Sequence, residues 1–262
     1  MPHITLNDVV IHYEFDQSAG TDRPVLVLSN SLGTDLSMWK PQVLSLASKY
    51  RLLRYDTRGH GDSPAASTPY TMAQLGQDVI GLMDSLQISK ASFCGLSMGG
   101  MIGIYIGINS PERIENLILA NTNAYTAQPE FWQKRIDTLL NDGGIPTIVD
   151  GVMARFFSPE FTSASPAVVA QVKAGMLATP LQGYVACCAA IRDMDFREGL
   201  SRIQAPTLVI AGRKDLASPP ENGQYIAANI KGARYAEIAA AHISNLEEPA
   251  EFTKLVADFM NN

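Results

Sequence analysis

A serine placed between two glycines is the residue whose setting most clearly indicates chemistry in this sequence. Gly95, Ser97 and Gly99 fit the pattern G-x-S-x-G. The pattern follows an apolar run typical of a strand and precedes residues 101–109, which have helical character. In that context the serine occupies a tight strand-to-helix turn that exposes its hydroxyl. The motif also arises by chance, but its surroundings favour Ser97 as a nucleophile.

A serine hydroxyl needs a base to act as a nucleophile near neutral pH. The sequence offers His3, His12, His60 and His242. The first two lie in an N-terminal segment far from any strand end that could face Ser97. His60 lies in a dense turn, where we expect it to hold the loop together by hydrogen bonds. His242 follows the last predicted strand, so we predict that it is the base.

A carboxylate usually orients such a histidine and stabilises its protonated form. Asp215 is the only acid in the loop of residues 212–220, which follows a strand. The order serine, aspartate, histidine along the chain is one that catalytic triads use. Aspartate is also common in turns for conformational reasons. We predict Asp215 as the third member, with Asp195 and Glu198 as weaker candidates.

Two backbone N–H groups must bind the negative charge that develops on an attacked carbonyl oxygen. The residue after the nucleophile, Met98, is expected to supply one. The loop of residues 29–33 is expected to supply the other, from Leu32.

Apolar runs alternate with segments of helical spacing along most of the chain. The runs are short and solidly apolar, as buried strands of parallel sheets are. The alternation predicts a mostly parallel, twisted sheet with helices on both faces. An antiparallel hairpin at one edge is predicted for residues 4–6 and 9–15. The other predicted strands are residues 25–29, 50–55, 91–94, 114–120, 207–211 and 233–238, and the clearest helical segments are 75–86 and 252–259.

Residues 123–197 depart from this alternation, with helical patterns, frequent breakers and no convincing strand. We call this segment the cap, because a helical insertion between two parallel strands would cover their carboxyl ends, where open α/β sheets bind ligands. The predicted division is a core of residues 1–122 and 198–262 with the cap inserted before the last strands.

The composition excludes several classes of protein. Twenty Lys and Arg against 26 Asp and Glu give a net charge of −6, which provides no basic surface for nucleic acid or anionic membrane. We see no signal peptide and no apolar stretch of about 20 residues. Cys94, Cys187 and Cys188 have the spacing of neither a disulfide framework nor a zinc site. We therefore expect reduced, buried cysteines in a cytoplasmic protein.

Several motifs resemble those of the α/β-hydrolase superfamily across essentially the whole chain. They are the order of strands, the serine turn, the segment 56–63 (DTRGHGDS) and the late histidine loop. More narrowly, residues 30–35 (NSLGTD), 95–101 (GLSMGGM) and 241–247 (AHISNLE) resemble 3-oxoadipate enol-lactonases, which serve the β-ketoadipate route of bacterial aromatic degradation. Many superfamily members carry His-Gly where this chain has Asn30-Ser31, a departure expected to reshape the pocket floor while leaving the backbone donors in place.

The resemblance implies a small enol-lactone with a carboxymethyl arm as substrate. Ser97 would attack the ring carbonyl and His242 would take its proton. The enol would leave and become a ketone, and water activated by His242 would release 3-oxoadipate. No metal or organic cofactor is implied.

An anionic arm in a mostly apolar pocket needs a donor or a cation. Trp132 and Arg135 are three residues apart, so on a helix they share a face. We predict that Trp132 packs on the ring or donates its indole N–H, and that Arg135 contacts the carboxylate. The alternative is that Trp132 belongs to the cap core and Arg135 is solvated, with Arg155 or Arg192 as substitutes.

The same triad also suits a general carboxylesterase, a cofactor-free perhydrolase and a hydrolase of carbon–carbon bonds. A haloalkane dehalogenase is disfavoured, because its nucleophile is an aspartate. A non-catalytic ligand-binding or receptor protein of this fold is a further alternative, against which the complete set Ser97, Asp215 and His242 argues. The sequence leaves the oligomeric state open.

Overall fold

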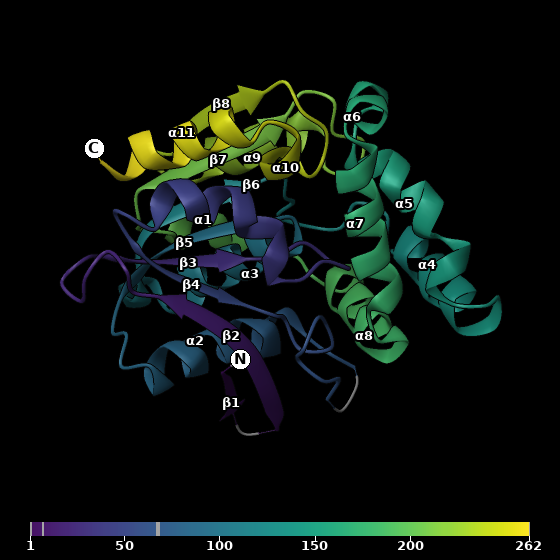
Figure 1. The fold of residues 1–262 in the computed structure, drawn as a ribbon, viewed down its shortest axis with the longest axis horizontal. Helices are drawn as coiled ribbons and strands as arrows, with labels where there is room; N and C mark the ends of the chain where they lie inside the picture. Colours follow the sequence, from purple (N-terminus) through teal and green to yellow (C-terminus); the bar gives the residue numbers. More distant parts are fainter. Residues whose placement is uncertain (1, 7, 67–68, 262) are drawn as a thin grey trace.

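The computed structural model describes residues 2–6, 8–66 and 69–261. Its centre is an eight-stranded sheet in the order β1-β2-β4-β3-β5-β6-β7-β8 (Figure 1). The β1–β2 and β2–β4 pairs are antiparallel, and all other neighbours are parallel. The prediction of a mostly parallel sheet with helices on both faces is confirmed.

The strands follow the apolar runs of the sequence, with small differences at their ends. Tyr50 lies outside β4, whereas β5 continues to Leu96 and β7 to Gly212. Their bounds are β1 (His3–Leu6), β2 (Val9–Asp16), β3 (Val25–Ser29), β4 (Arg51–Tyr55), β5 (Ala91–Leu96), β6 (Ile114–Ala120), β7 (Thr207–Gly212) and β8 (Arg234–Ile238).

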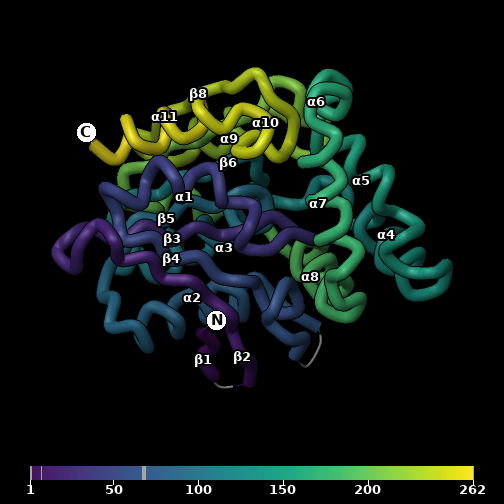
Figure 2. The backbone as a smooth tube through the Cα atoms, viewed as in Figure 1, coloured from purple at the N-terminus to yellow at the C-terminus, as the bar shows by residue number. Residues whose placement is uncertain are grey.

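The core helices form two groups around the sheet. One group contains α1, α10 and α11, and the other contains α2 and α3, while α9 packs on β7 and β8 (Figure 1). The chain runs from the β1–β2 hairpin at one edge to α11, which lies beside α1 (Figure 2). These helices are α1 (Lys40–Leu46), α2 (Met72–Ser85), α3 (Met98–Asn109), α9 (Pro220–Asn229), α10 (Ser244–Glu247) and α11 (Pro249–Met260), with short 3-10 turns η1 (Leu36–Trp39), η2 (Pro111–Arg113) and η4 (Arg197–Arg202).

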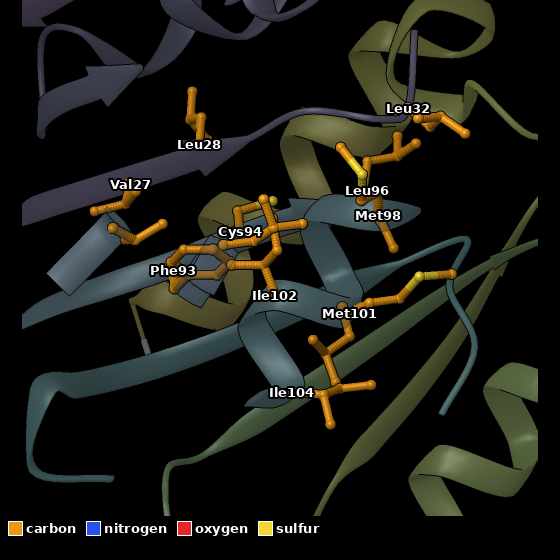
Figure 3. Close-up of a cluster of buried hydrophobic side chains, with 14 of the residues drawn as sticks. Val27, Leu28, Leu32, Phe93, Cys94, Leu96, Met98, Met101, Ile102 and Ile104 are labelled. Carbon is orange, nitrogen blue, oxygen red and sulfur yellow. The ribbon is translucent and has the colours of Figure 1, made fainter. Parts of the chain in front are cut away.

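Helix α3 begins at Met98, three residues before the predicted helical segment. Its first turn includes Gly99 and Gly100, which carry no apolar side chain and so gave no helical pattern. The helix is apolar on nearly every side, which fits its position against β5, β6 and α2. Side chains from β3, β5 and α3 fill the space behind this turn, among them Phe93, Cys94 and Ile102 (Figure 3).

Five α-helices lie between β6 and β7, beyond one end of the sheet (Figure 1). Three of them begin at a proline that also marks a break in the sequence pattern, as expected for a residue that fits the first helical position. Tyr125 and Asp195 form an antiparallel bridge at the base of this segment, a pairing too short to show in the sequence. The helices are α4 (Pro129–Asn141), α5 (Val149–Phe156), α6 (Pro159–Ala164), α7 (Pro166–Ala178) and α8 (Leu181–Arg192), with a 3-10 turn η3 (Ile145–Thr147).

Within the described residues, no single helix is both long and apolar enough to cross a membrane. Helices α7 and α8 meet those criteria only as a pair, and they meet at a bend of 96°. The three cysteines are free and buried, and burial raises the pKa of each thiol.

A buried ion pair ties the turn after β4 to helix α2. The Arg58 guanidinium donates two hydrogen bonds of 2.6 Å to Asp78, and both side chains are almost fully buried. Arg58 also donates two longer hydrogen bonds, of 3.2 and 3.3 Å, to the exposed Asp8. Loss of Asp78 leaves the buried guanidinium with this partner alone, which is destabilising because most of the compensation of its charge is removed. A surface pair on the same helix, Asp84 with Arg113, offers a comparison because the Asp84 side chain is 61% exposed.

We expect Asp78→Ala to lower the free energy of unfolding by about 3 kcal/mol, and Asp84→Ala to lower it by less than about 1 kcal/mol. Urea denaturation of both variants measures the difference. Equal losses would show that the buried pair is not a main support of the turn.

His60 lies in the same turn, and its buried ring lies 6.4 Å from that of Tyr184 between centroids. Burial lowers the pKa of His60 from 6.5 to about 4. The unfolded chain therefore takes up this proton at a higher pH than the folded protein does. Protonation of His60 in the unfolded state should therefore lower the free energy of unfolding as the pH falls from 6.5 to 4. The total decrease over this interval should be about 3 kcal/mol.

The measurement is urea denaturation at several pH values between 7 and 4, for the wild type and His60→Gln. We expect the variant to lose clearly less stability across this interval. A parallel decline of both proteins would contradict the assignment.

Candidate active site

Ser97 lies at a sharp turn between β5 and α3, with φ +57° and ψ −116°. A positive φ is unusual for a residue with a side chain and is maintained only where the surroundings impose it. Here the two motif glycines allow backbones to touch. A Cβ on Gly95 would lie 2.1 Å from the Gly99 carbonyl oxygen, and one on Gly99 would lie 2.2 Å from the Ser29 oxygen. The G-x-S-x-G spacing is thus the condition for this turn.

The structure brings Ser97, His242 and Asp215 together. His242 Nε2 lies 2.9 Å from Ser97 Oγ, and His242 Nδ1 lies 2.8 Å from Asp215 Oδ2. All three side chains are buried. With Nδ1–H donated to the carboxylate, Nε2 is left to accept the serine proton, which is the arrangement a general base needs.

Asp215 is fixed by further donors in the loop after β7 and at the end of β6. Its Oδ1 accepts hydrogen bonds from the N–H groups of Ala217 (2.8 Å) and Ser218 (2.9 Å). Its Oδ2 also accepts one from Asn121 Nδ2 at 3.0 Å. The weaker candidates do not reach His242: Asp195 is exposed and pairs with Arg197, and Glu198 is exposed as well.

Asn121 is a site residue that the sequence reasoning missed. It follows β6 directly, with φ +47°, a conformation that asparagine tolerates better than most residues. Its Oδ1 accepts a hydrogen bond of 2.6 Å from the Ser244 hydroxyl, while its Nδ2 contacts Asp215 and the Ala241 oxygen. Asn121 therefore joins the acid loop to the base loop. An asparagine directly after a buried strand was the one available signal.

The loop of residues 29–33 lies against the serine turn. Gly99 N–H donates to the Asn30 oxygen at 2.9 Å, which brings Leu32 to the wall of the Ser97 pocket. Within the described residues, the N–H groups of Leu32 and Met98 donate to no protein acceptor. Both are therefore available to a ligand oxygen, as the oxyanion-hole prediction requires.

Asn30 and Ser31, which stand where many superfamily members carry His-Gly, have different surroundings. The Asn30 amide bonds inward, accepting from Trp39 Nε1 at 2.9 Å and donating to the Tyr55 oxygen at 2.7 Å. Ser31 alone of the two lines the pocket.

A cavity of about 410 Å³ is lined by Ser97 and His242 and lies between the strand ends and the cap. Trp132, Arg135, Arg155 and Tyr184 are among the residues that line it. A smaller cavity, of about 160 Å³, lies between η1 and α7 and is lined by none of the triad residues. In the part of the chain that the structure describes, no cluster of His, Cys, Asp and Glu side chains is arranged to hold a metal ion.

Trp132 and Arg135 share a face of α4, as the three-residue spacing predicts. The Arg135 guanidinium carbon lies 5.0 Å from the Trp132 ring centroid and 4.8 Å from that of Phe131, and Arg155 lies 5.1 Å from the Phe131 centroid. Arg192 differs: it pairs with Asp193 and does not line the cavity. The structure thus places two of the three candidate arginines at the site.

A serine on a strand-to-helix turn of a mostly parallel sheet, hydrogen-bonded to a histidine that is in turn hydrogen-bonded to an aspartate, is typical of serine hydrolases of one fold. The chain belongs to the α/β hydrolase fold family, whose model matches residues 24–249.

Individual relatives show which enzymes of this family the chain resembles. The chain is 41% identical to 3-oxoadipate enol-lactonase 2 of Acinetobacter baylyi over 98% of its own length and 95% of the relative's. It is 36% identical to 3-oxoadipate enol-lactonase 1 of the same organism, over 91% and 89%. The crystal structure of the enol-lactonase from Burkholderia xenovorans LB400 superposes with a TM-score of 0.97 at 44% identity, covering all of both chains. The predictions of an α/β hydrolase and of a resemblance to the enol-lactonases are confirmed.

Proposed function

We propose that this protein is a 3-oxoadipate enol-lactonase that works through an acyl-enzyme on Ser97. The observation that carries the proposal is one cavity that is lined both by a hydrogen-bonded serine and histidine and by cap arginines. Similarity to named enol-lactonases over nearly the whole chain supports the substrate. A nucleophile and a cation in one cavity suit an ester or lactone that carries a negative charge.

In the first half of the reaction, Ser97 Oγ attacks the ring carbonyl and its proton moves to His242 Nε2. The N–H groups of Leu32 and Met98 bind the oxygen that becomes negative. The bond from the carbonyl carbon to the ring oxygen then breaks, and His242 returns the proton to the departing enol oxygen. The opened chain, now an ester of Ser97, carries an enol that converts to the ketone.

In the second half, His242 takes a proton from a water molecule, and the water oxygen attacks the ester carbonyl. Collapse breaks the bond to Ser97 Oγ, which regains a proton from His242. The balance is one lactone and one water consumed for each 3-oxoadipate released. Asp215 stabilises the imidazolium that forms twice in this sequence.

The carboxymethyl arm requires a partner in the cavity, since an unpaired carboxylate in apolar surroundings is costly. Arg135 is half-buried and lies over the rings of Phe131 and Trp132. Within the described residues, neither Arg135 nor Arg155 forms an ion pair with a protein carboxylate, whereas Arg192 does. A guanidinium can bind a carboxylate through two parallel hydrogen bonds. We assign Arg135 to the substrate carboxylate, because its side chain is half-buried whereas that of Arg155 is exposed. Trp132 packs beside it on the ring.

The alternatives use the same triad with other substrates. A general carboxylesterase or perhydrolase acting on neutral esters has no need of guanidinium groups in its cavity, and a carbon–carbon bond hydrolase remains a second choice.

The proposed reaction needs no metal or organic cofactor. The cytoplasmic location and the division into core and cap stay predictions, and the oligomeric state is open.

The direct test follows the ultraviolet absorbance of 3-oxoadipate enol-lactone in the presence of wild type and Ser97→Ala. We expect rapid loss of absorbance with the wild type and none above background with the variant. Hydrolysis of p-nitrophenyl acetate without turnover of the lactone would keep the triad and reject the substrate.

Arg135→Met should raise the KM for the enol-lactone about 10- to 100-fold, because a hydrogen bond to a charged group is lost. Its kcat/KM for uncharged p-nitrophenyl acetate should stay close to that of the wild type. Arg192→Met is the matched control and should change neither constant more than about 2-fold, since its side chain is paired outside the cavity. Equal effects of the two variants on the lactone would contradict the role of Arg135.

A further inference from the structure

Glu247 is a buried carboxylate that the proposed mechanism does not use. It lies at the end of α10, five residues after His242. Its Oε2 accepts hydrogen bonds from the N–H groups of Ala241 (3.1 Å) and Ser158 (3.2 Å), and its Oε1 accepts one from the Ser158 hydroxyl. All three donors are uncharged, and their hydrogen bonds offset the hydration that the carboxylate lost on burial.

These hydrogen bonds join two segments that are far apart in the sequence. Ala241 directly precedes the catalytic histidine, whereas Ser158 lies in the cap between α5 and α6. The Ser158 hydroxyl also accepts a hydrogen bond from Phe161 N–H at 3.2 Å, so it caps α6 while donating to Glu247. Glu247 thus links the start of a cap helix to the loop of the base.

The neighbouring cap residue Phe156 makes two further contacts with the same loop. Its carbonyl oxygen accepts a hydrogen bond from Ile243 N–H at 3.0 Å. Its ring stacks on the His242 imidazole, with centroids 5.4 Å apart and planes inclined by 30°. The residues on both sides of His242 are therefore hydrogen-bonded to the cap segment 156–158, one directly and one through Glu247.

We propose that Glu247 is a positioning residue for the catalytic base. By holding Ala241 against Ser158, it fixes the backbone of His242 and so keeps Nε2 within hydrogen-bond distance of Ser97 Oγ. The base is in place only when the cap segment 156–158 is seated. This inference rests on the proposed roles of Ser97 and His242, but not on the enol-lactone as substrate.

The choice of a carboxylate follows from the donors. A carboxylate accepts hydrogen bonds through both oxygens, which matches two N–H donors and one hydroxyl donor. Glu247→Met removes both acceptor oxygens at nearly the same side-chain length and therefore breaks the link. Ser158→Ala is milder, because it removes the hydroxyl and keeps both backbone hydrogen bonds.

The test measures kcat and KM for the hydrolysis of p-nitrophenyl acetate. This choice of ester makes the test independent of the proposal that the enol-lactone is the substrate. Small displacements of catalytic groups are costly, so we expect Glu247→Met to lower kcat about 10- to 100-fold with little change in KM. Ser158→Ala should lower kcat about 3-fold. Glu251→Met, at an exposed glutamate of α11, is the matched control and should behave as the wild type.

A second readout separates positioning from general stability. The low-field proton NMR resonance of the His242 Nδ1–H, which faces Asp215, should shift or broaden in Glu247→Met at a temperature where thermal unfolding shows the variant to be folded. An unchanged kcat and an unchanged resonance in folded Glu247→Met would overturn the proposal, as would a loss confined to KM.

If Glu247→Met does not fold, Ser158→Ala decides alone, and wild-type kcat in that variant would overturn the proposal. A wild type that hydrolyses the acetate but not the lactone would reject the proposed substrate and leave this test intact.

Discussion

The contact of three backbones at the serine turn is the constraint on which the site depends. β5 enters the turn, α3 leaves it and β3 lies beside it, so close that a Cβ on Gly95 or Gly99 would fall within about 2 Å of a neighbouring backbone. The contact forces Ser97 to a positive φ and points its hydroxyl out of the sheet end. It also places the N–H of Met98 at the start of a helix and draws the loop that carries Leu32 alongside. The positions of Ser97 and of both proposed donors thus follow from one backbone contact.

The remaining groups reach the serine because parallel strands end at one edge of the sheet. Asn121, Asp215 and His242 follow β6, β7 and β8, which are neighbours in the sheet although far apart in the sequence. Their hydrogen bonds to one another tie three loops into one structure. The cap completes this arrangement, supplying the arginines of the cavity and the segment that holds the histidine loop.

Much of this could be predicted because the strands at the centre are buried on both faces and therefore read as solid apolar runs. The triad followed from motif context and from its position after strands. No bounds were predicted for helices α1 and α9, because α1 has seven residues with few buried and α9 is mainly polar. The contacts of Asn121, Phe156 and Glu247 are tertiary, and no periodicity marks them. Arg155 and Arg192 looked equivalent until the structure showed which side chain already had a carboxylate partner.

The central claim is that Ser97, activated by His242, is the nucleophile. The most direct measurement is labelling with a fluorophosphonate probe, followed by peptide mass spectrometry. We predict one modified residue, Ser97, with no labelling in Ser97→Ala and strongly slowed labelling in His242→Ala. A folded protein that does not react, or that is modified at another residue, would contradict it.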